Sequence, residues 1–203
     1  MKKDTQSILF WGSLWGITES VLGYGLHLAS VALPGLPGFV LFPLAFFFMR
    51  RAYLATGQTS AVFSAAVVAA LIKMTDFLVP NPVPILIVNP ALALLLEGAA
   101  VAVIMIYRKD RELRVPDFFA MGIVWRGVFL LYMLLINLYD LPAGLVTSGP
   151  AVALRFLFVE SVINAGLMFA ITRLDKKAHV PIRRPLLAYT ALAAALLAQF
   201  FLP

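Results

Sequence analysis

Long apolar segments alternate with short breaks of proline, glycine and charged residues along the whole chain. Each segment comes near the ~20 residues that a helix needs to cross the hydrocarbon core of a bilayer. The pattern predicts an all-α protein, a polytopic transmembrane helical bundle that forms a single integral membrane domain over residues 1–203. About seven spans (six to seven) are predicted, since the last segment is short and terminal. Their approximate limits are 8–30, 37–54, 60–79, 84–107, 118–139, 150–172 and 186–202.

The composition supports this class of protein. Hydrophobic residues make up 62% of the 203 residues and charged residues only 13%, about half the usual share in a soluble domain. A soluble core could not bury so much apolar surface. There are no cysteines, which excludes disulfides and thiolate metal sites. The only histidines, His27 and His179, lie far apart in the chain, so no metal site is predicted.

Basic residues are concentrated in alternate connections. Thirteen of the 16 Lys and Arg residues lie before the first span or between spans two and three, four and five, or six and seven. By the positive-inside rule this side is cytoplasmic. The N-terminus is then inside, and the chain is a multi-pass protein of the cytoplasmic (cell) membrane. Topology and contact with anionic membrane lipids explain the net charge of +6, so nucleic acid is not an expected partner.

Seven ionisable residues fall inside the predicted spans. Each costs about 2.5–3.5 kcal/mol at a helix centre on the insertion scale, so they must face one another, a wet cavity or a partner. Two interpretations stay open: interhelical salt bridges that fix helix register, or a solute site or proton path. The seven are Glu19, Lys73, Asp76, Glu97, Arg126, Arg155 and Glu160.

The stretch from Lys73 to Gly98 combines charges with four prolines and two Asn-Pro pairs. Prolines free backbone groups that must find partners. We therefore predict two helix ends around a polar pocket near the outer face, with the outer part of the fourth span unwound or kinked at Asn89–Pro90. The predicted substrate-binding residues are Asp76, Asn89, Glu97, Asn137, Glu160 and Asn164, and the predicted buried charge network adds Glu19, Lys73, Arg126 and Arg155.

The first span carries a face of small residues that includes a GxxxG pair, Gly12 and Gly16. Such a pair lets another helix approach closely. That helix belongs either to the same bundle or to a separate subunit docked on this face, and the sequence leaves both open.

Aromatic residues cluster near the predicted span ends. The aromatic belts at the two membrane interfaces are expected to include Trp11, Trp15, Tyr24, Tyr107 and Tyr139. The run of three phenylalanines at 46–48 is expected to contact lipid rather than a ligand.

Several features of the first half of the chain resemble the substrate-binding S components of energy-coupling-factor (ECF) vitamin transporters. They are the small size, the GxxxG pair, the PGLPG connection at 34–38 and the IKMTD end of the third span. The resemblance implies a compact bundle that holds a vitamin or metal near the outer face and docks on a membrane coupling subunit driven by two ATPases. Gly12 and Gly16 would then be the docking face, and Asp76, Asn89 and Asn137 the pocket. That family usually has six spans with both ends inside, whereas seven are counted here.

These patterns predict a membrane transport component that binds a small solute in an outer-facing polar pocket. A stand-alone ion- or proton-coupled transporter that uses Glu19, Glu97 and Glu160 is one alternative, and a non-catalytic membrane subunit or scaffold of a larger complex is another. No catalytic residue and no cofactor are predicted, because the chain lacks G-x-S-x-G, H-E-x-x-H and a cysteine nucleophile. An intramembrane enzyme acting on lipid stays a further alternative.

Overall fold

The computed structural model describes residues 3–29, 36–80, 82–109, 111–175 and 185–201, and its regular secondary structure over these ranges is entirely helical. Five helical segments are long and apolar enough to cross a membrane, which indicates a membrane-embedded protein. The all-α class is therefore confirmed, and five of the predicted spans correspond to helices that could cross a membrane. These segments are Pro37–Thr56, Ser60–Leu78, Pro84–Arg108, Val115–Asn137 and Pro150–Leu174.

The other two predicted segments also form helices, α1 (Lys3–Ala29) and α9 (Pro185–Phe201), although neither is among those five. Part of the PGLPG connection, the basic residues at 176–184 with His179, and the side chains of Tyr24 and His27 lie outside the described residues. The remaining elements are α2 (Leu36–Thr56), α3 (Ser60–Met74), the 3₁₀ turn η1 (Thr75–Leu78), α4 (Pro84–Arg108), α5 (Val115–Asn137), α6 (Gly144–Thr147), α7 (Pro150–Leu154), the π-helical η2 (Arg155–Val159) and α8 (Glu160–Leu174).

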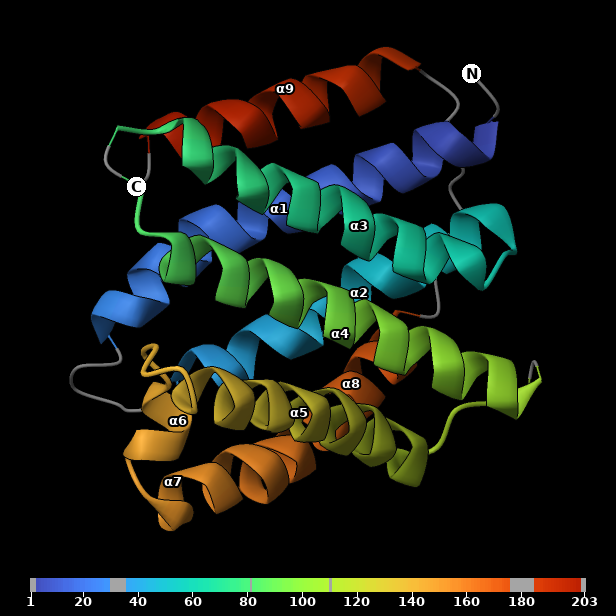
Figure 1. The fold of residues 1–203 in the computed structure, drawn as a ribbon. Helices are drawn as coiled ribbons and strands as arrows, with labels where there is room; N and C mark the ends of the chain where they lie inside the picture. Colours follow the sequence, from blue (N-terminus) through green and yellow to red (C-terminus); the bar gives the residue numbers. More distant parts are fainter. Residues whose placement is uncertain (1–2, 30–35, 81, 110, 176–184, 202–203) are drawn as a thin grey trace.

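The long helices run side by side in one bundle (Figure 1). Helix α2 lies inside it and packs against α1, α3 and α8. On one side α3 packs on α4, α4 on α5 and α5 on α8, while α9 covers the outer side of α1. The chain from α7 through η2 to α8 forms one continuous helical segment.

Small residues bring the helices around α3 close together. The buried face of α3 is largely alanine, including Ala66, and Gly98 on α4 lies so near that a Cβ at this position would collide with the Ala66 side chain. A Cβ at Gly12 of α1 would lie 2.7 Å from Val68 Cβ, and one at Gly16 would lie 2.9 Å from Ile72 Cδ1. In a bilayer, close backbone approach of this kind favours helix association. The GxxxG face of α1 is thus occupied by α3 of the same chain.

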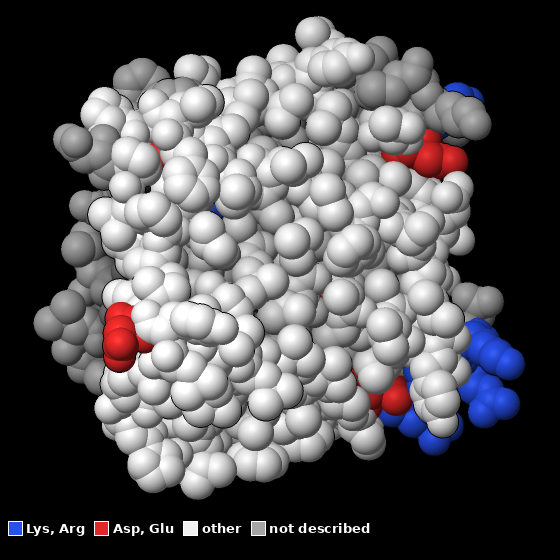
Figure 2. Space-filling model, viewed as in Figure 1, with Lys and Arg blue, Asp and Glu red and all other residues white. Residues whose placement is uncertain are grey.

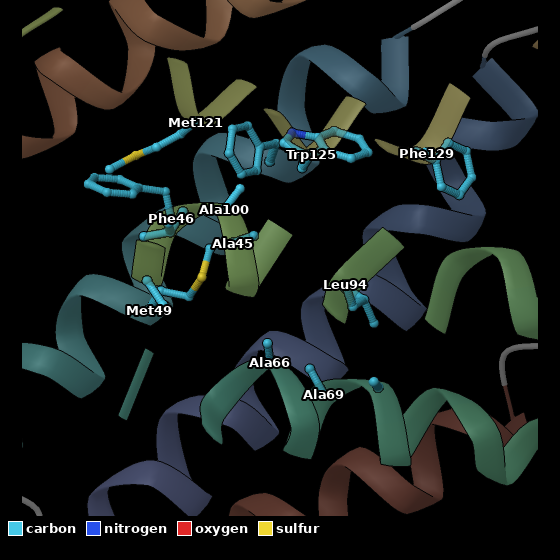
Figure 3. Packing of buried hydrophobic residues seen from close by; sticks show 14 of the residues in the cluster. Ala45, Phe46, Met49, Ala66, Ala69, Leu94, Ala100, Met121, Trp125 and Phe129 are labelled. Atoms are coloured by element: carbon cyan, nitrogen blue, oxygen red, sulfur yellow. The ribbon is translucent and has the colours of Figure 1, made fainter. Parts of the chain in front are cut away.

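Aromatic and sulfur-containing side chains fill the rest of the core (Figure 3). Phe46 of α2 is 1% exposed and meets Phe118 of α5 edge to face, at 5.4 Å between ring centroids. The expectation that Phe46 contacts lipid is therefore wrong, and so is the interfacial placement of Trp15, which is buried in the same cluster. Both lie where several helices converge, which hydropathy alone does not reveal. Tyr107 and Tyr139 are exposed near helix ends, as expected for interfacial aromatics.

Several described basic residues near the ends of the spans gather at one end of the bundle. Arg50 and Arg51 of α2 both pair with Asp175, just beyond α8. Arg108, at the end of α4, lies 3.3 Å from Asp117 in the first turn of α5. Figure 2 shows the blue side chains gathered at the edge where α4 ends and α5 begins. The alternating loop charges seen in the sequence thus come together in space.

Candidate functional site

A cavity of about 590 Å³ opens between α1, α2, α3, α4, α5 and η2. Its lining comes from the second half of α1, the first turns of α2, the last turn of α3 and the first half of α4. Since the basic end lies at the opposite termini of α2 and α4, the cavity occupies the other half of the bundle. A smaller cavity of about 210 Å³ lies at the basic end, where Arg50 and Arg108 are already paired with carboxylates.

The most unusual lining group is the carboxylate of Glu97 on α4. This side chain is 7% exposed and borders the cavity, yet it makes no hydrogen bond or ion pair within the described part of the chain. Glu19 of α1 also borders the cavity and likewise has no such partner among the described residues. An ionised carboxylate in a membrane interior is costly without a partner, so these two groups mark the place where the protein leaves polarity uncompensated. We call this space the Glu97 cavity.

Lys73 is the one basic residue among those that line the Glu97 cavity. Its Nζ lies 2.6 Å from Asp76 Oδ2, and the two residues share a helix face because they are three apart. Lys73 also attracts Glu19 electrostatically. The charge of Lys73 is thus already matched by that of Asp76.

The proline-rich stretch forms one wall of the cavity, although not as an unwound segment. Helix α4 begins at Pro84 and continues through Asn89 and Pro90 as a single helix, so the predicted unwinding at this pair is wrong. Proline has no N–H, which leaves the Leu86 carbonyl without its usual donor four residues on. Leu86, Asn89 and Pro90 all line the cavity. The Tyr132 hydroxyl donates to Asn89 Oδ1 at 2.7 Å and so orients the amide.

A second polar group lies behind this wall and centres on Arg126 of α5, which is 0% exposed. Its Nη2 donates to Asn164 Oδ1 at 2.5 Å and to the Gly38 carbonyl at 3.1 Å. Its Nη1 donates to the Ser161 hydroxyl at 3.4 Å. Glu160 Oε2 lies 3.6 Å from Nη2 and supplies the counter-charge. We call these residues the Arg126 cluster; it joins α2, α5 and α8.

Aromatic rings border both the Arg126 cluster and the cavity. The guanidinium carbon of Arg126 lies 5.6, 4.6 and 5.3 Å from the ring centroids of Phe42, Trp125 and Phe156, and all three residues line the cavity. Phe156 belongs to the π-helical turn η2, a rare element that is frequent at functional sites. This turn precedes Glu160 directly, so it positions Phe156 in the cavity wall and Glu160 in the Arg126 cluster.

The structure divides the predicted site residues between these two groups. Asn89 and Glu97 border the cavity together with Glu19 and Lys73, and Asp76 joins them through its ion pair. Glu160 and Asn164 contact Arg126. Neither Asn137, half-buried at the end of α5, nor Arg155, at the start of η2, is among the lining residues.

Sequence reasoning missed the aromatic wall formed by Phe42, Trp125, Phe129 and Phe156. Trp125 and Phe129 are four residues apart and so share a helix face, which is the one signal in the sequence that could have indicated it. Among the described residues, no group of three or more His, Cys, Asp or Glu side chains is arranged to hold a metal ion.

No protein-family model, curated protein or solved structure matches the chain. The resemblance to ECF S components therefore rests on the sequence motifs alone.

Proposed function

We propose that this protein is an integral membrane component of a transport system and binds a small solute in the Glu97 cavity. One observation carries the proposal: a membrane-embedded bundle keeps a space of about 590 Å³ bordered by four aromatic residues and by two carboxylates that have no ion-pair partner in the described part of the chain. Small-molecule sites are typically 300–1,000 Å³, mostly apolar, with a few polar groups that fix orientation. A purely structural role would favour filling this space and pairing these charges.

The proposed orientation in the membrane rests on the basic end of the bundle. With the basic end on the cytoplasmic side, the N-terminus is inside, α1 and α9 complete seven spans, and the Glu97 cavity lies in the outer half of the cell membrane. Solute would then enter from outside, as the likeness to S components implies.

A coupling subunit remains part of the proposal through that likeness. Its docking cannot use Gly12 and Gly16 in the present conformation, because α3 covers both glycines. Docking on this face would require α3 to move away from α1.

A binding screen tests the proposal. Purified protein in detergent is exposed to a panel of vitamins, amino acids and amines, and stabilisation is read by thermal shift and bound mass by native mass spectrometry. Ala93 lines the cavity, so Ala93→Phe should abolish any binding that the wild type shows. Val88 on the same helix is 37% exposed and is not a lining residue, so Val88→Phe is the matched control. A panel without any stabilising solute, or binding that Ala93→Phe leaves intact, would contradict the proposal.

A stand-alone proton-coupled transporter is the second candidate, favoured by the two unpaired carboxylates at one cavity. Proteoliposomes that contain only this chain distinguish it from a component of a larger system. Solute uptake driven by a pH gradient and lost in Glu97→Gln would support the stand-alone transporter. A chain that binds solute but transports none under any gradient would instead support the component.

A further inference from the structure

The chemistry of the cavity wall narrows the ligand class. We propose that the Glu97 cavity binds a small organic cation, a protonated amine on an apolar or aromatic body, with Glu97 and Glu19 as its counter-charges. This inference rests on the proposed function, since it names the kind of solute that the same site would take.

Acidic residues outnumber basic residues around the cavity. Glu19, Glu97 and the ion pair of Lys73 with Asp76 give three acids and one base. Adding the pair of Arg126 and Glu160 behind the aromatic wall leaves the same excess of two acids. Arg155, which acts on Glu160 from the start of η2, reduces the excess only to one. The surroundings therefore favour a positively charged occupant.

Glu97 and Glu19 have no hydrogen-bond or ion-pair partner among the residues that the structure describes. Glu97 is more than nine-tenths buried, borders the empty space and makes no hydrogen bond within the described residues. It interacts electrostatically with Glu19, a like charge, and with Arg126 on the far side of the rings. An ammonium group between the two carboxylates would relieve their repulsion and supply the missing donors.

Other polar groups lie on the same wall of the cavity. Pro90 leaves the Leu86 carbonyl without its helical donor, and Asn89 presents an amide whose oxygen already accepts from Tyr132. Ser20, which also lines the cavity, donates to the Gly16 carbonyl and accepts from Gln199. The Leu86 carbonyl thus adds an acceptor to the two carboxylates, whereas the Asn89 NH2 group and the Trp125 indole contribute donors to the same cavity. A protonated amine, which carries only donors, would bind at the acceptors.

One side of the cavity is apolar and aromatic. Trp125 lies 5.6 Å from Phe156 and 6.2 Å from Phe129 between ring centroids, so the rings form a continuous wall. Such a wall takes an apolar or aromatic body, and ring faces attract cations. The volume of about 590 Å³ is far larger than a bare ion requires, and no described cluster is suited to a metal. The occupant is therefore organic.

Three probes of similar size and different charge test the inference. They are 2-phenylethylamine, 2-phenylethanol and 3-phenylpropanoate, each titrated into purified wild-type protein in neutral detergent, with binding followed by native mass spectrometry and thermal shift. We expect the amine to bind about 10- to 100-fold more tightly than the alcohol, since hydrogen bonds to charged groups contribute about 1.5–3 kcal/mol. The carboxylate should bind more weakly still.

Variants assign the effect to the two carboxylates. Glu97→Gln and, independently, Glu19→Gln should weaken the amine and leave the alcohol nearly unchanged. Glu112→Gln is the control, because Glu112 lies at the basic end of the bundle and its side chain is 74% exposed.

Each outcome has a distinct meaning. Equal or tighter binding of the alcohol or the carboxylate, blocked by Ala93→Phe, would overturn the cation inference and leave the solute site standing. No binding of any of the three probes would overturn the inference as well, while the broader screen described above decides the proposed function separately.

Discussion

Arg126 and Glu97 are both ionisable and buried within one membrane-embedded bundle, yet their surroundings differ. Arg126 donates to Asn164, Ser161 and the Gly38 carbonyl, and it has Glu160 beside it. Glu97 borders open space and has no hydrogen-bond partner among the described residues.

The number of partners, rather than the type of residue, indicates whether a buried ionisable side chain has a structural or a functional role. A buried charge with a nearly complete set of partners joins helices, and removing it leaves other polar groups unpaired. A buried charge without partners adds nothing to the stability of the empty protein. Its retention makes physical sense where a ligand or a proton completes the site. The comparison can be tested by changing each side in turn.

The largest effect is expected for Arg126→Met, which keeps much of the side-chain volume and removes the charge. Glu160 then loses its counter-charge and Asn164 its donor. We expect the free energy of unfolding to fall by about 3–5 kcal/mol, as when one partner of a buried ion pair is removed. Denaturant titration in micelles, followed by circular dichroism, measures this.

Arg111→Met is the control for that experiment. Arg111 is exposed in the loop between α4 and α5, and the change should stay within about 0.5 kcal/mol. If the two variants lost similar stability, the Arg126 cluster could not be called structural.

Gly38 belongs to both the Glu97 cavity and the Arg126 cluster. Gly38→Ala should have the next largest effect on the free energy of unfolding. It lines the cavity, its carbonyl accepts from Arg126, and a Cβ there would overlap the Glu160 carboxylate. Displacing this carboxylate from Arg126 should cost about 1–3 kcal/mol, the usual range for overpacking.

The matched substitution is Gly127→Ala on α5. A Cβ at Gly127 would meet nothing within 4 Å, so the higher helix propensity of alanine should raise stability by up to about 1 kcal/mol. Opposite signs for the two glycines, measured by the same titration, are the expected result. A loss at Gly127 as large as that at Gly38 would show that the cluster is not the cause.

The sequence predicted the helices much better than the way they converge. Apolar length and the prolines and glycines between segments predicted the five helices that are long enough to cross a membrane, because a bilayer demands about 20 apolar residues for each crossing. The burial of Trp15 and Phe46 could not be predicted in this way. Hydropathy measures how apolar a residue is, and lipid and protein core are equally apolar surroundings.

The candidate site was predicted in part for a similar reason. The cost of buried charge indicated that Glu19, Glu97 and Glu160 needed partners, but their sequence positions do not decide which of them finds one. Glu160 lies beside Arg126 because the π-helical turn η2 changes the helix register just before it. The irregularity has no clear sequence signal. Pro90 had a clear signal and yet did not interrupt α4, since neighbouring helices tolerate one missing hydrogen bond.

Tyr132→Phe should have a smaller effect on stability, and it tests the Glu97 cavity rather than the Arg126 cluster. It removes the hydroxyl that donates to Asn89 at 2.7 Å, and we expect a loss of about 0.5–1.5 kcal/mol. Binding of the amine probe should weaken too, because the Asn89 amide is then free to rotate. Tyr139→Phe is the control, since Tyr139 is 72% exposed. Unchanged thermal stability and unchanged binding in Tyr132→Phe would remove Asn89 from the site.

The smallest change in stability is expected for Glu97→Gln, and its sign is the sharpest test of the comparison. Because Glu97 has no hydrogen bond or ion pair to lose among the described residues, the neutral amide should keep the free energy of unfolding within about 0.5 kcal/mol of the wild type or raise it. Glu160→Gln has the same chemistry but leaves Arg126 without its counter-charge, so it should destabilise the protein clearly. Both variants are measured without ligand by the same denaturant titration. If Glu97→Gln lost as much stability as Glu160→Gln, the Glu97 carboxylate would have a structural partner in the empty protein, and the distinction between a closed cluster and an open site would fail.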